Sequence, residues 1–144
     1  MDLKTKLNEF LADLNVLHCK LQNYHWNVEG KEFFQTHAKL EEMYDNISKQ
    51  IDEIAEHILI LGEQPLGRLK DYIEISNIKE TESKNIQSEE IYNILLSDYE
   101  NLLKKSIEIK EEAENQKEYS TSSLIDEYIL EYSKIIWMLK NVTK

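Results

Sequence analysis

The 144-residue sequence is poor in the residues that interrupt helices, because it contains only three glycines and one proline. This scarcity predicts few turns and long helices. The single cysteine, Cys19, excludes an intrachain disulfide and a cysteine-based zinc site. Since Cys19 falls inside a helical stretch, we expect a small apolar filler rather than a reactive thiol.

Long apolar runs are also missing, and none approaches the roughly 18 residues that a membrane-spanning helix needs. The first ten residues, MDLKTKLNEF, lack the apolar block of a signal peptide. Basic residues are scarce, with 17 Lys and Arg against 28 Asp and Glu and a net charge of -11. Because phosphate binding needs clustered cations, this balance disfavours a general affinity for DNA or anionic membranes. We expect a cytoplasmic protein with no membrane association.

Four segments repeat apolar residues at alternating spacings of three and four, the pattern of helices in an antiparallel bundle. The first two predicted helices span about 3–28 and 33–61, with a break at 29–31. The last two span about 88–116 and 121–140. The pattern therefore predicts an all-α protein.

A long linker separates the two predicted helical pairs. Gly62 and Pro65 end the second helix, since glycine serves as a helix C-cap and proline cannot continue a helix. The linker runs from 63 to about 85, and its segment 66–73 has the pattern of a short helix. Two helical hairpins joined by a long crossover predict a ferritin-like four-helix bundle, a single domain over residues 1–144.

Four side chains of metal-ligand type lie along the second predicted helix. His37 occupies a position that elsewhere holds Phe, Leu, Ile or Tyr, where a lone histidine is most often a packed core residue. Glu41 follows one turn later, and Asp52 and Glu56 form another pair four residues apart. At about 100° per residue, the four side chains share an arc of about 100°. Acidic pairs are usually a solvated face, but these flank an apolar seam.

His25 joins this set through the predicted hairpin, which puts it level with His37, so both can meet Glu41 within one chain. Asp52 lies about 22 Å beyond His37 at about 1.5 Å per residue, too far to share a site in one chain. Two copies of the second helix, packed antiparallel about a two-fold axis, bring Asp52 and Glu56 of one chain opposite Glu41 and His37 of the other. Two imidazoles with three carboxylates suit iron, with zinc or manganese as competitors.

A conventional ferritin site inside one bundle needs Glu-x-x-His motifs, and the sequence has none. Instead, the spaced ligand set resembles the Dps family (DNA-binding protein from starved cells), the mini-ferritins. The resemblance rests on these matched motifs: His25-Trp26-x-x-x-Gly30-x-x-Phe33, His37, Glu41, Tyr44, Asp52-x-x-Ala55-Glu56, Pro65-Leu66-Gly67 and Ile136-Trp137-Met138-Leu139. They cover nearly the whole chain, and the ligand set is the most specific part.

The resemblance implies a hollow dodecameric shell with ferroxidase centres at two-fold interfaces through the second helix. Such centres oxidise Fe(II), preferably with hydrogen peroxide, and the shell stores the Fe(III) as mineral and protects against oxidative damage. By this resemblance His25 of one chain, with Asp52 and Glu56 of its partner, holds the tighter iron. His37 and Glu41 serve a second, weaker position, so that each intersubunit site takes two irons.

Several other residues are interpreted through the same resemblance. Trp26 is expected beside the site as an electron donor or quencher, with a plug at the end of the bundle as the alternative. Glu41 stands where the family usually has Asp, and its extra methylene bears on the second iron position. His57 is interpreted as a surface residue or a weak extra ligand. Glu118 and Glu127 are candidates for a negative pore through which iron enters.

Two other functions compete with iron oxidation. One is a nucleoid-associated, DNA-protecting shell with weak or no ferroxidase activity. DNA binding in the family resembles tethering by a Lys-rich tail, but only Lys4 and Lys6 lie near the start of this chain. We therefore expect no direct DNA binding at physiological salt. The other is a purely structural bundle whose acidic face is simply solvated.

Overall fold

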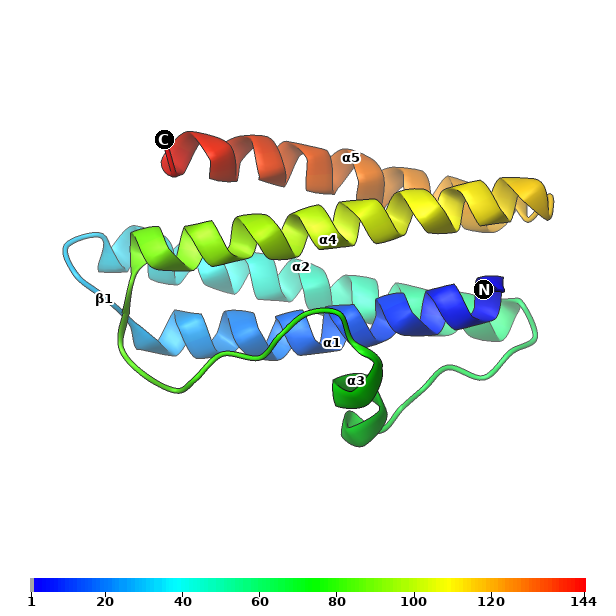
Figure 1. Ribbon diagram of the computed structural model, residues 1–144, viewed down its shortest axis with the longest axis horizontal. Coiled ribbons are helices and arrows are strands. Elements are labelled where there is room, and N and C mark those ends of the chain that lie inside the picture. Colours follow the sequence, from blue (N-terminus) through cyan, green and yellow to red (C-terminus); the bar gives the residue numbers. More distant parts are fainter. Residues whose placement is uncertain (1) are drawn as a thin grey trace.

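The computed structural model describes residues 2–144 as a bundle of four long helices with a crossover (Figure 1). In chain order the elements are α1 (Leu3–Asn27), β1 (Val28–Glu29), α2 (Phe33–Ile60), α3 (Leu69–Ile75), β2 (Ile86–Gln87), α4 (Ser88–Asn115) and α5 (Tyr119–Val142). The helices form two hairpins, α1–α2 and α4–α5, and the crossover runs along α1. The predicted all-α bundle with a short helix in its crossover is confirmed.

The ends of the long helices follow from local chemistry. The Asp2 carboxylate accepts a hydrogen bond from the Thr5 backbone N–H at 2.8 Å and caps α1. Beyond α2, Gly62 has φ +82, and its N–H donates to the Leu59 carbonyl at 2.9 Å. The C-cap itself is Leu61, and Gly62 ends the helix as the next residue, because its left-handed conformation favours glycine.

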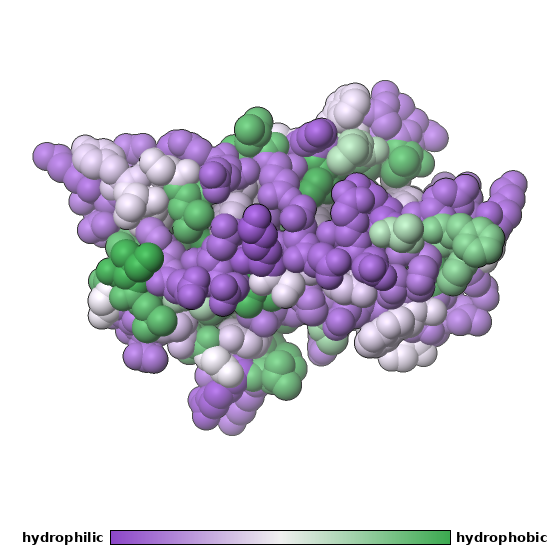
Figure 2. Space-filling view, turned by 180° about the vertical axis from the view of Figure 1, so that it is seen from behind, coloured by the Kyte–Doolittle hydropathy of each residue, from purple (hydrophilic) through white to green (hydrophobic). Residues whose placement is uncertain are grey.

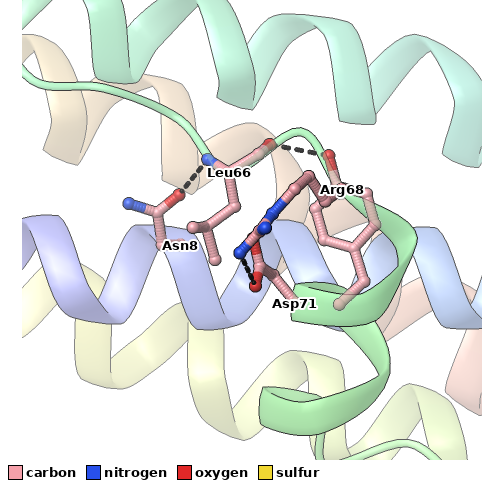
Figure 3. A network of polar contacts seen from close by, with 5 residues as sticks. Asn8, Leu66, Arg68 and Asp71 are labelled. Carbon is pink, nitrogen blue, oxygen red and sulfur yellow. Dashed lines mark hydrogen bonds and ion pairs between the residues drawn. The ribbon is translucent and has the colours of Figure 1, made fainter.

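The short helix of the crossover was predicted at 66–73 and begins three residues later, at Leu69. The Leu66 N–H donates to the Asn8 side chain of α1 at 2.9 Å, which keeps this segment extended (Figure 3). Arg68 then forms a two-pronged ion pair with Asp71, both contacts at 3.0 Å. Because Leu66 is bonded to α1, α3 begins later in the chain than the sequence pattern predicts.

Asp13 of α1 anchors the C-terminal end of α3 through hydrogen bonds. Its side chain is 1% exposed and accepts hydrogen bonds from the Ser76 hydroxyl at 2.9 Å and the Asn77 N–H at 2.7 Å. Burial raises the pKa of Asp13, while these two donors oppose that rise. The crossover is therefore anchored through a buried carboxylate.

A two-residue parallel pairing, β1 with β2, closes one end of the bundle, and the sequence pattern does not predict it. Val28 lies opposite Ile86, and both are buried. Gly30 follows with φ +116, and a Cβ there would lie 2.7 Å from the Gln87 side-chain oxygen. This closure fixes the connection between α1 and α2.

The interior is apolar and aromatic, whereas the face shown in Figure 2 is largely hydrophilic with separate hydrophobic patches. Phe10, Tyr99, Tyr128 and Tyr132 form an aromatic centre, with neighbouring ring centroids 5.8–6.4 Å apart. Large apolar side chains that stay exposed include Trp26, Phe34, Leu59, Ile60, Leu130 and Trp137. In the part of the chain that the structure describes, no helix has both the length and the apolarity needed to span a membrane.

Candidate metal centre

The α1–α2 hairpin brings His25 and His37 into direct contact. Their rings stack with centroids 3.7 Å apart and planes tilted by 14°. Phe33 stacks on the outer face of this pair, 4.9 Å from the His37 ring, and Tyr44 meets His25 edge-on at 5.3 Å. His25 is 5% exposed. Both imidazoles are therefore held in place by aromatic neighbours.

Reciprocal hydrogen bonds fix the protonation pattern of the two rings. Nδ1 of His25 lies 2.7 Å from the His37 carbonyl oxygen, and Nδ1 of His37 lies 2.7 Å from the His25 carbonyl oxygen. A carbonyl oxygen only accepts, so Nδ1 carries the proton in both neutral rings. Each Nε2 then presents a lone pair. Imidazoles that bind metals are commonly oriented by such a bond from the other ring nitrogen.

Glu41 is the carboxylate nearest to this pair within one chain. Its Oε1 lies 3.6 Å from Nε2 of His25, and its side chain is 56% exposed. Glu41 thus approaches His25, although the family resemblance assigns it to the same iron position as His37. The long side chain keeps one carboxylate oxygen on the His25 side of the site.

Asp52 and Glu56 lie farther along α2, where both are exposed. Among residues 2–144, no three His, Cys, Asp or Glu side chains gather as a metal-binding group. His25 thus contacts both His37 and Glu41, but the three are not arranged as a metal-binding group, and Asp52 and Glu56 lie apart from them.

The acids of α2 lie among apolar side chains that the bundle covers only partly. Phe33, Tyr44, Ile51 and Ala55 are partly buried, and the neighbouring Phe34 is 83% exposed. An apolar strip with acidic residues along it is typical of a surface that contacts another chain. The spacing of apolar residues predicts Phe33, Tyr44 and Ile51 in the bundle seam, but the structure buries them only partly. The same spacing places Leu40, Ile47, Ile54 and Ile58 in the seam, and these four are buried as predicted, together with Met43.

Three interpretations from the sequence are wrong. Trp26 is 68% exposed, so it does not plug the end of the bundle. His57 is 6% exposed and bonds through Nε2 to the Thr121 hydroxyl at 2.7 Å, so it is not a surface residue. Burial lowers its pKa, and the nearby Glu118 opposes this shift. Cys19 is exposed rather than a packed filler, because it lies on the outer side of α1.

The two pore candidates occupy different positions around the start of α5. Glu118 is the half-buried residue that precedes α5, and Glu127 is exposed within it. Nine residues separate them, which is about 180° around a helix at about 100° per residue. They do not share one face of α5, and their role at a pore stays a prediction. Nearby, Asp126 is paired with Lys110 at 2.8 Å, a contact that the sequence did not indicate.

Comparisons with known proteins agree with this architecture. Residues 4–144 match the family described as Ferritin-like domain. DNA protection during starvation protein 2 of Bacillus anthracis is 41% identical over 137 residues, covering 93% of this chain and 91% of that protein. DNA protection during starvation protein of Helicobacter pylori (strain J99) is 35% identical over 134 residues, covering 93% of each.

A solved structure extends the agreement to three dimensions. The Dps protein of Vibrio cholerae O1, described as a member of a broad superfamily of ferritin-like diiron-carboxylate proteins, superimposes with a TM-score of 0.95. It is 37% identical, and the match covers 99% of this chain and 89% of that one. The fold class is thus ferritin-like, as the sequence predicted. Within that class, the chain belongs to the Dps family.

Proposed function

We propose that this chain is an iron-oxidising and iron-storing mini-ferritin whose oxidation sites form between two copies. The observation that carries the proposal is the stacked pair of His25 and His37, each with its Nδ1 proton committed to a carbonyl. Their Nε2 atoms are free to bind a metal ion beside Glu41. Imidazole with carboxylate is a donor set that suits Fe(II), which is the substrate here.

The proposed site is completed by antiparallel contact between the α2 helices of two subunits. This contact supplies Asp52 and Glu56, which are exposed along the same partly apolar strip. A two-fold axis then generates two identical sites per pair. Closure of such pairs into a hollow dodecamer is the assembly that we propose. The relative from Vibrio cholerae, described as a member of a superfamily of ferritin-like diiron-carboxylate proteins, supports an iron site built from carboxylates.

Each residue has a distinct role in the proposed reaction. His25, with Asp52 and Glu56 of the partner subunit, holds the tighter Fe(II), and His37 holds the second. Glu41 lies close to His25 and has two oxygens, so it is suited to bridge both positions. Hard carboxylate oxygens favour the more charge-dense Fe(III), which lowers the cost of oxidation.

The proposed chemistry balances for two irons and one hydrogen peroxide. Each Fe(II) gives one electron, the O–O bond breaks, and two protons are taken up to give two Fe(III) and two waters. Supplying both electrons at one site limits the release of hydroxyl radical. Trp26, exposed next to His25, is the proposed donor of a further electron when only one iron is bound. The preference for peroxide over oxygen rests on the family resemblance.

An anaerobic Fe(II) titration followed by peroxide tests the proposal. Fe(III) absorbance and Trp fluorescence are recorded for the parent and for an Asp52→Ala/Glu56→Ala variant. The proposal predicts fast oxidation in the parent and its loss in the variant. Equal, slow oxidation in both would contradict it.

The second candidate function is protection of DNA, which the names of the Bacillus and Helicobacter relatives favour. With a net charge of -11, we propose that any such protection acts through removal of iron and peroxide rather than through direct binding. A gel shift at low and moderate salt tests this point. Retention of DNA at both salt concentrations would contradict it.

A further inference from the structure

The side of α2 that faces the bundle carries polar residues bonded to α5. The Glu131 carboxylate accepts hydrogen bonds from Asn46 at 2.6 Å and from Gln50 at 2.9 Å. The Tyr132 hydroxyl donates to the Gln50 side-chain oxygen. Toward the end of α2, the Tyr128 hydroxyl donates to Glu53 at 3.0 Å. With the His57–Thr121 bond at 2.7 Å, these contacts form what we call the α2–α5 ladder.

The ladder lies on nearly the opposite side of α2 from the candidate metal ligands. Its α2 members, at positions 46, 50, 53 and 57, span an arc of about 60° at about 100° per residue. The centre of that arc is about 140° from the centre of the arc of His37, Glu41, Asp52 and Glu56. In the chain, Glu53 directly follows Asp52 and His57 directly follows Glu56. Each distant acid thus has a ladder residue as its immediate neighbour.

Hydrogen bonds restrict a helix differently from apolar contacts. The apolar neighbours of α2 pack without directional preference, so they restrict a small rotation of the helix less sharply than hydrogen bonds do. A hydrogen bond weakens steeply when its angle or length changes. Gln50, His57 and Thr121 are 3%, 6% and 0% exposed, so water does not readily replace a lost partner. The ladder is therefore a directional restraint on the rotation of α2 about its own axis.

We infer that the α2–α5 ladder contains positioning residues for the iron site, with Tyr128 and His57 setting the direction of Asp52 and Glu56 toward the partner subunit. The inference rests on the proposed function, because it requires that Asp52 and Glu56 bind iron. With side chains extending about 6 Å from the helix axis, a rotation of about 10° moves a carboxylate by about 1 Å. A displacement of that size is large compared with the roughly 0.5 Å tolerance of a metal or catalytic site.

The test uses Co(II) as a probe that binds without being oxidised under anaerobic conditions. Affinity and the visible d–d spectrum are measured on the assembled protein for the parent, Tyr128→Phe and His57→Leu. Tyr128→Phe removes only the hydroxyl that bonds to Glu53, and His57→Leu removes the bond to Thr121. We expect both variants to bind Co(II) about 10- to 100-fold more weakly, with altered spectra, as for other residues that orient metal ligands.

Two matched variants separate positioning from general loss of stability. His57→Gln keeps a polar group within reach of Thr121 and is expected to restore most of the affinity. Tyr99→Phe makes the same chemical change as Tyr128→Phe on a buried tyrosine that takes no part in the ladder, and is expected to bind Co(II) like the parent. Size-exclusion chromatography confirms the assembly of every variant.

The possible outcomes are distinct. Unchanged affinity and spectra in Tyr128→Phe and His57→Leu, with binding abolished in Asp52→Ala/Glu56→Ala, would overturn the ladder inference alone. Equal weakening in Tyr99→Phe and Tyr128→Phe would also overturn it, because the effect would then be general. If the parent bound Co(II) no better than Asp52→Ala/Glu56→Ala, the proposed function itself would fall, and the inference with it.

Discussion

At the scale of single residues, the reciprocal bonds between His25 and His37 link the backbone of the hairpin to the chemistry of the site. The Nδ1–H of each ring donates a hydrogen bond to the backbone carbonyl oxygen of the other histidine, so neither ring rotates independently. The arrangement directs the Nε2 atom of each ring away from its backbone partner. Preorganised ligands of this kind lose little conformational entropy when they bind.

The length of the Glu41 side chain is expected to affect the binding of Fe(II). In Glu41→Asp the carboxylate withdraws by one methylene from His25, which Glu41 approaches at 3.6 Å in the structure. We expect weaker binding of the first Fe(II) equivalent, because the shorter side chain draws the carboxylate away from His25. Anaerobic calorimetry with Fe(II) measures both stoichiometry and affinity. Two unchanged binding steps would show that Glu41 does not take part.

Part of this site was predictable from the sequence because one turn fixes it. The short break between α1 and α2 sets the register of the hairpin, and the register puts His25 level with His37. The burial of His57 was not predictable, because it depends on Thr121, 64 residues away on α5. The exposure of Trp26 was not predictable either, because the sequence pattern at the end of a helix is the same for a buried and for an exposed aromatic residue.

At the scale of elements, the connection after α1 depends on Gly30. Its φ of +116 is a conformation that side-chain-bearing residues rarely adopt, and a Cβ would meet the Gln87 side chain. We expect Gly30→Ala to lower the free energy of unfolding by about 1–3 kcal/mol. Gly67→Ala is the matched control, since nothing lies within 4 Å of a Cβ there. Urea denaturation that ranks both variants equal would contradict this account of the turn.

The crossover provides a prediction about pH through Asp13. Burial raises its pKa above the value in the unfolded chain, partly offset by Asn77, Ser76 and Lys105, while Glu9 adds to the rise. The stability contributed by the protonated form is fully present below the unfolded pKa and is lost as pH rises through the folded pKa. Asp13→Asn stays neutral, so its stability relative to the parent should be greater at about pH 7 than near pH 4.

Urea denaturation of both proteins at the two pH values measures this difference directly. Asn keeps the side-chain oxygen that accepts from Ser76 and Asn77, so the anchor itself is preserved. Other titrating groups affect both proteins alike and cancel in the comparison. If the advantage of Asp13→Asn grew as the pH fell, the pKa of Asp13 would be lowered rather than raised.

The elements themselves were largely predictable, and their exceptions have physical reasons. The four long helices follow from periodicity and from the scarcity of helix breakers. The start of α3 was misplaced because Asn8, far away in the sequence, holds Leu66 extended. The pairing of β1 with β2 joins residues that are 58 positions apart in the sequence. Each strand has only two residues, which is too short to show a periodic pattern of apolar residues.

At the scale of the whole molecule, one chain carries part of the proposed site and a partly covered apolar strip on the same helix. Asp52 and Glu56 lie exposed beside Ile51 and Ala55, which the bundle covers only partly. In the proposed assembly, a second copy of α2 completes the ligand set and buries the strip in a single contact. The central claim is therefore that each iron site is shared between two subunits.

Complementation between two inactive variants tests this claim most directly. Asp52→Ala/Glu56→Ala keeps both histidines, and His25→Ala/His37→Ala keeps both acids. When the two are dissociated, mixed in equal amounts and reassembled, half of the two-fold pairs are mixed, and each mixed pair contains one intact site of two. We predict that Fe(II) oxidation by peroxide returns to about a quarter of the parental rate per subunit. A mixture as inactive as each variant alone, with assembly intact, would contradict the shared site.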